Sequence, residues 1–143
     1  MIGKSIFFLV RNRSLITALL IFTTLAILVL TMLPSNKLGD SQLYEYDKLG
    51  HFGLFFVWTF IFGLFNFARK NFNSHLITIF LIGSLFGIMI EIMQGILPYG
   101  RSASVYDALA DIAGSLTATI ILFGIKRRYM VRYRELLNKR RRL

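Results

Sequence analysis

The sequence predicts an all-α membrane protein, a four-transmembrane-helix bundle with both termini cytoplasmic and a basic amphipathic C-terminal helix. Three observations lead to this fold class. The 143 residues are 55% hydrophobic, with a mean hydropathy of +0.61, which is too apolar for an ordinary soluble domain. Four apolar stretches approach the roughly 20 residues needed to cross a bilayer. The basic residues lie mostly at one end of these stretches.

The first apolar stretch covers residues 15–33, after Arg11 and Arg13 and before Pro34. Its position resembles that of a secretory signal. Its apolar run is longer than a typical signal core, and no small-x-small cleavage site follows it. We therefore expect a retained membrane helix.

Three further spans complete the predicted transmembrane domain of residues 15–125. The second, 49–68, contains Trp58 and many phenylalanines, the third is 76–97, and the fourth is 105–125. A cytoplasmic segment, 1–14, should precede this domain.

The distribution of bases predicts the topology. Fourteen of the seventeen Lys and Arg residues lie before the first span, between the second and third, or after the fourth. The other side holds Lys37, Lys48 and Arg101. By the positive-inside rule, we expect a multi-pass protein of the cell (inner/plasma) membrane, N-in and C-in.

Polar residues are predicted to meet in the outer leaflet. Glu91 lies six residues before the end of the third span and Asp111 six after the start of the fourth, so both lie about 9 Å below the outer boundary. The second span begins at the same face with Asp47, Lys48 and His51. The expected ligand-binding residues are Arg101, His51, Glu91, Gln94, Asp107 and Asp111.

Small residues lie on the same helix faces as these polar residues, deeper in the membrane. Gly83 and Gly87 share a helix face with Glu91 and Gln94. A second stripe contains Asp107, Asp111, Gly114, Ser115 and Ala118. We expect the two stripes to pack against each other.

Purely structural roles are the alternative explanation for the residues of the predicted site. Ser104 and Asp107 fit a capping box. Arg101 can pair with the buried acids, His51 can be an interfacial residue, and Gln94 can bridge helices by hydrogen bonds.

The tail of residues 126–143 combines nine bases with Tyr129, Tyr133, Leu136 and Leu137 at helical spacing. This pattern indicates a helix that binds anionic lipids of the cytoplasmic leaflet. We expect no nucleic-acid partner, because the adjacent membrane explains the charge better.

The elements Asp47-Lys48-x-x-His51, Glu91-x-x-Gln94, Gly100-Arg101 and Ser104-x-x-Asp107 resemble, in this order, the VanZ-like family of small bacterial membrane proteins. The resemblance covers roughly residues 45–125. That family commonly has Asn where this chain has Asp111. The extra acid makes the site more anionic unless burial keeps it protonated.

The resemblance implies a role in the cell envelope and in resistance to glycopeptide antibiotics such as teicoplanin. We expect the outer site to bind an envelope lipid, a lipid-linked wall precursor or a lipophilic glycopeptide. The alternatives are a membrane enzyme acting on a lipid-linked or cell-wall substrate, with Glu91, Asp107 and His51 as candidate catalytic residues, and a scaffold for a membrane-protein partner.

No cofactor and no metal are expected. The chain has no cysteine, and none of the sequence patterns of zinc hydrolases, serine hydrolases or P-loop proteins occurs. A divalent cation held by His51, Glu91, Asp107 and Asp111 is the weaker alternative.

Overall fold

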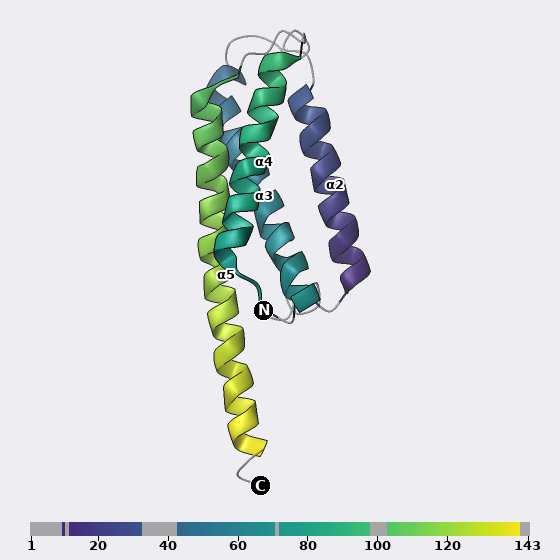
Figure 1. Cartoon of the computed structure of the whole chain (residues 1–143), viewed down its shortest axis with the longest axis vertical. Coiled ribbons are helices and arrows are strands. Elements are labelled where there is room, and N and C mark those ends of the chain that lie inside the picture. The colour runs from purple at the N-terminus through teal and green to yellow at the C-terminus, as the bar shows by residue number, and fades with distance from the viewer. Residues whose placement is uncertain (1–9, 11, 33–42, 71, 98–102, 141–143) are drawn as a thin grey trace.

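The described part of the chain forms a bundle of four helices, seen in a computed structural model (Figure 1). The structure describes the backbone of residues 10, 12–32, 43–70, 72–97 and 103–140, and the side chains of these residues except 31–32, 43–46 and 131–140. The helices are α2 (Arg13–Met32), α3 (Leu43–Lys70), α4 (Leu76–Ile96) and α5 (Val105–Arg140). All four are long and apolar enough to cross a membrane, so the predicted all-α bundle of four membrane-spanning helices is confirmed.

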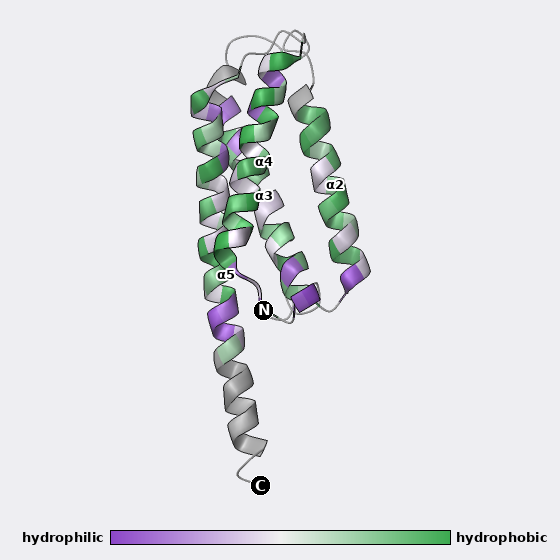
Figure 2. Cartoon of the chain, viewed as in Figure 1, coloured by the Kyte–Doolittle hydropathy of each residue, from purple (hydrophilic) through white to green (hydrophobic). Residues whose placement is uncertain are grey.

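Successive helices run in opposite directions, which gives the bundle two chemically different ends (Figure 1). At one end α2 and α4 finish while α3 and α5 begin; we call it the His51 end. At the other end, the basic end, lie Arg13, Arg69, Lys70 and Lys126. Figure 2 shows hydrophilic residues near both ends and mainly apolar residues between them.

Helix α3 contacts each of the other three helices. Its closest approach is to α5 at Gly114, where an added Cβ would overlap the backbone carbonyl oxygen of Phe52 and lie 3.0 Å from the backbone nitrogen of Phe56. Helix α2 is held to α3 by a hydrogen bond of 2.8 Å from the Trp58 indole nitrogen to Thr24 Oγ1.

The predicted packing of the two small-residue stripes is correct in part. An added Cβ on Gly87 would lie 2.6 Å from the Asp111 Cβ, and one on Gly83 would lie 2.9 Å from Ser115 Oγ, so the stripe of α4 does meet α5. Gly114, however, faces the backbone of α3. The reason is that α5 packs between α3 and α4 and therefore divides its small residues between two neighbours.

Apolar packing closes the basic end. Phe72, in the connection after α3, stacks on Tyr129 of α5 with ring centroids 3.8 Å apart, and Lys126 Nζ donates a 2.8 Å hydrogen bond to the backbone oxygen of Ser74. Helix α5 then continues to Arg140, beyond the ends of the other helices (Figure 1). The basic tail is thus helical as far as Arg140 and extends the fourth span without a break.

Candidate functional site

His51 is the centre of a polar cluster at the His51 end. Its side chain is only 5% exposed, although it lies in the third turn of α3. The ring Nδ1 lies 3.0 Å from Asp111 Oδ1 on α5 and 3.5 Å from Glu91 Oε1 on α4. We call His51, Glu91 and Asp111 the buried trio, because the two carboxyl side chains are 5% and 0% exposed.

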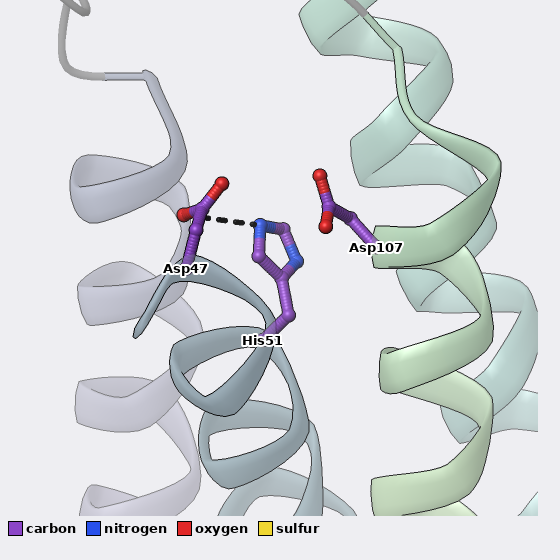
Figure 3. A group of neighbouring side chains, drawn as sticks. All are labelled: Asp47, His51 and Asp107. Carbon is purple, nitrogen blue, oxygen red and sulfur yellow. Dashed lines mark ion pairs between the residues drawn. The ribbon is translucent and has the colours of Figure 1, made fainter. Parts of the chain in front are cut away.

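Two further carboxyl groups flank the imidazole, one on each side of the ring. Asp47, one turn before His51 on α3, places Oδ1 4.0 Å from His51 Nε2. Asp107 comes from the first turn of α5 on the other side of the ring (Figure 3). Ligand atoms of Asp47, His51 and Asp107 all lie within 4.8 Å of one another. Both aspartates are partly exposed, so we call them the mouth pair.

The start of α5 explains why Asp107 is available to face His51. Ser104 Oγ accepts a 3.3 Å hydrogen bond from the backbone nitrogen of Asp107, which is the first half of the expected capping box. The second half differs, because the backbone nitrogen of Ser104 donates to Glu91 Oε2 on α4, at 3.0 Å. Glu91 therefore caps α5 from a neighbouring helix, in the place expected for the Asp107 carboxylate.

Two carboxyl oxygens in the buried trio have no hydrogen-bond partner among the described residues. They are Glu91 Oε1 and Asp111 Oδ2, each buried at the atomic level. The single hydrogen that Nδ1 can carry points to one acceptor, and the shorter contact assigns it to Asp111. Burying carboxylates in this way is costly unless a cation or a proton compensates for the charge.

The described residues supply few positive charges at this end. Lys48 is exposed, with Nζ 6.0 Å from the centre of the Tyr106 ring, so it connects the second turn of α3 with the first turn of α5. The described residues of the cluster contain four carboxyl groups, against the Lys48 ammonium and the His51 imidazole. The cluster is therefore acidic, unlike the opposite end of the bundle.

Polar contacts continue below the buried trio. Thr59 Oγ1 donates a 3.0 Å hydrogen bond to Ser115 Oγ between α3 and α5, and both side chains are fully buried. Ser84 Oγ on α4 is buried without a hydrogen-bond partner among the described residues. Thr59, Ser84 and Ser115 thus form a layer of buried hydroxyl groups beneath the acidic residues.

An apolar groove lies between α2 and α3 on the His51 half of the bundle. Its volume is about 410 Å³. Gly50 and Gly53 of α3 contribute to it, and a Cβ at either position would meet no atom within 4 Å. The remaining lining residues are Thr23, Ala26, Ile27, Leu49, Leu54 and Val57.

The structure brings together four of the six residues predicted for the site, namely His51, Glu91, Asp107 and Asp111. Gln94 is buried one turn further along α4 from Glu91. Arg101 lies outside the described residues.

The structure adds Asp47 and Ser104 to the site. Their signals were present in the sequence, since Asp47 precedes His51 by one helical turn and Ser104 precedes Asp107 by three residues.

The chain was also compared with known proteins. A model of the VanZ/LLP1 family matches residues 3–127, and so includes α2 as well as the helices that form the site. No curated protein and no solved structure matches the chain. The match spans most of the sequence and all the elements that build the His51 cluster, and the chain therefore belongs to the VanZ/LLP1 family of multi-pass membrane proteins.

Proposed function

We propose that the cluster at the His51 end binds the polar headgroup of a lipid-anchored envelope molecule in the outer leaflet of the bacterial inner membrane. The ligand class comprises envelope lipids, lipid-linked wall precursors and lipophilic glycopeptides, and the biological consequence is glycopeptide resistance. The observation that carries the proposal is the convergence of acidic side chains from α3, α4 and α5 around His51 within a membrane-spanning bundle.

The charge distribution supports an extracytoplasmic position for this cluster. Arg13, Arg69, Lys70 and Lys126 all lie at the basic end, which the positive-inside rule assigns to the cytoplasm. Both termini are then cytoplasmic. The basic extension of α5 begins in the cytoplasmic headgroup region, where anionic lipids are its partners.

The mouth pair suits recognition of hydrogen-bond donors. Ionised carboxylates accept hydrogen bonds from hydroxyl and ammonium groups, which sugars, amino sugars and amine headgroups provide. Asp47 and Asp107 are partly exposed, whereas the buried trio beneath them is closed to a large headgroup. Arg101, between α4 and α5 in the sequence, is the proposed partner for a phosphate or carboxylate of the same ligand.

The groove between α2 and α3 suits the apolar part of the ligand. We assign it an acyl or prenyl chain, because its lining is almost entirely apolar and the helices that form it are membrane spans. Gly50 and Gly53 keep the groove open, and Gly50 directly precedes His51 in the chain.

Drug susceptibility tests this proposal. The chain, expressed in a teicoplanin-sensitive Gram-positive host, should raise the concentration of teicoplanin needed to stop growth. Asp107→Asn and Arg101→Ala should each remove the effect at equal protein level in the membrane. Thr117→Val is the matched control on α5, since Thr117 Oγ1 bonds only its own helix, to the backbone oxygen of Ala113. Full protection by both site variants would contradict the proposal.

An enzyme is the second candidate, favoured by the contact between His51 and Asp111. A histidine whose Nδ1 is held by a carboxylate presents Nε2 as a general base, and Nε2 lies 4.0 Å from Asp47 Oδ1. Purified protein should then convert a lipid-linked substrate, with loss of turnover in His51→Gln or Glu91→Gln and normal turnover in Thr117→Val. Turnover that is equal in all variants would exclude this reading.

A further inference from the structure

We infer that the buried trio is a divalent-cation site of zinc or manganese type, with His51 Nδ1, Glu91 Oε1 and an Asp111 carboxylate oxygen as ligands. One imidazole and two carboxylates form a donor set that both metals accept. The inference is independent of headgroup binding, since it concerns residues beneath the mouth pair.

The distances within the trio fit ligands that share one ion. Nδ1 lies 3.0 Å from Asp111 Oδ1 and 3.5 Å from Glu91 Oε1. Ligands bound at about 2.0–2.2 Å in tetrahedral or octahedral geometry are roughly 3.0–3.5 Å apart. The trio therefore needs only small side-chain adjustments to surround a cation.

The unpartnered oxygens point to the same conclusion. Glu91 Oε1 is buried, lies 3.5 Å from Nδ1 and has no hydrogen-bond partner among the described residues. Asp111 Oδ2 is also buried and also has no hydrogen-bond partner among them. Glu91 has its other oxygen in use by Ser104 N, and Asp111 Oδ1 exchanges its contact with Nδ1 for the ion when Nδ1 becomes a ligand. A metal ion gives the remaining oxygens a partner and offsets their charge.

The mouth pair completes the pattern expected around a metal-bound histidine. Such a histidine usually donates its second ring N–H to a carboxylate, which fixes the ring orientation. When a cation replaces the hydrogen on Nδ1, the neutral ring carries its hydrogen on Nε2, toward Asp47, with Asp107 on the other side of the ring (Figure 3). Asp47 is therefore a positioning residue in this site, and three protein ligands leave a coordination position for water.

Metal binding by the full-length protein tests the inference. Protein purified in detergent without a histidine tag is stripped with a chelator and titrated with Zn²⁺ and, separately, with Mn²⁺, and bound metal is measured against a competing chromogenic chelator. Wild type should bind one ion per chain. Glu91→Gln keeps the side-chain shape but should lose stoichiometric binding, and Asp47→Asn should weaken it by about 10–100-fold.

Two controls separate a specific site from general effects. Glu135→Gln also removes one carboxylate, from the basic extension of α5, and should bind metal as wild type does. Thermal unfolding of each metal-free variant shows whether it is folded, and Co²⁺ added to wild type should give the visible absorption bands of a protein-bound ion. No stoichiometric binding of either metal by wild type, or equal binding by Glu91→Gln and Glu135→Gln, overturns the inference.

Discussion

His51 Nδ1 and Asp111 Oδ1 lie 3.0 Å apart, although 60 positions separate the two residues in the chain. This contact joins the first part of α3 to the first part of α5, within a bundle whose other interior contacts are mostly apolar. A hydrogen bond between a histidine and a carboxylate in such surroundings fixes the relative position of the helices that carry the site.

Asp111→Ala should lower the free energy of unfolding by about 1–3 kcal/mol, because it removes the acceptor nearest to the buried His51 Nδ1. Asp111→Asn keeps an acceptor oxygen and should cost less. Denaturant titration of both variants in detergent micelles measures the difference. An Asn variant that is as unstable as the Ala variant would contradict a hydrogen-bonding role for this oxygen.

The Thr59–Ser115 hydrogen bond should couple α3 and α5 energetically. Thr59→Val and Ser115→Ala each leave one buried hydroxyl without its partner, and each should cost roughly 1 kcal/mol. The double variant removes both hydroxyls and should cost less than the sum of the two. A double-mutant cycle of unfolding free energies measures this coupling, and strict additivity would show that the contact contributes nothing.

Gly114→Ala should destabilise the bundle by about 1–3 kcal/mol, because the added methyl group meets the backbone of α3. Backbone atoms cannot move aside as a flexible side chain can, so the two helices must separate. Gly124→Ala is the matched control on the same helix, since a Cβ there meets no atom within 4 Å. Thermal unfolding should show a large loss for the first variant and little change for the second; similar stability of the two would refute the close α3–α5 approach.

The topology can be tested with single cysteines, because the natural chain has none. Ala103→Cys lies just before α5 at the His51 end, and Asn73→Cys lies between α3 and α4 at the basic end; both positions are exposed. A membrane-impermeant maleimide applied to intact cells should label only Ala103→Cys, whereas both should react after permeabilisation. Labelling of Asn73→Cys alone in intact cells would reverse the proposed orientation.

Much of the bundle was predictable because helix geometry is regular. The four spans follow from apolar length, and Glu91 and Asp111 were placed level by counting 1.5 Å per residue from the ends of their helices. The structure confirms that prediction, since both side chains contact the same ring nitrogen. Depth in a helical bundle depends mainly on residue number, so a sequence determines it well.

Rotation and side-chain partners were less predictable. Gly114 faces α3, and Glu91 takes the backbone N–H that Asp107 was expected to bind, because both outcomes depend on how three helices pack together. The predicted fourth span ends at Ile125, whereas the helix that contains it ends at Arg140. The bases after Ile125 end the apolar segment, yet Lys, Arg and Leu favour helix, so α5 continues to Arg140.

The central claim is that the cluster around His51 binds a lipid-anchored envelope molecule, and native mass spectrometry tests it most directly. Wild-type protein, released from bacterial membranes in mild detergent, should retain a lipid or lipid-linked adduct. The adduct should be largely lost from Asp107→Asn and retained by Thr117→Val, with all three proteins equally folded. Identical adducts on wild type and Asp107→Asn, or no adduct on the wild-type protein, would contradict the claim.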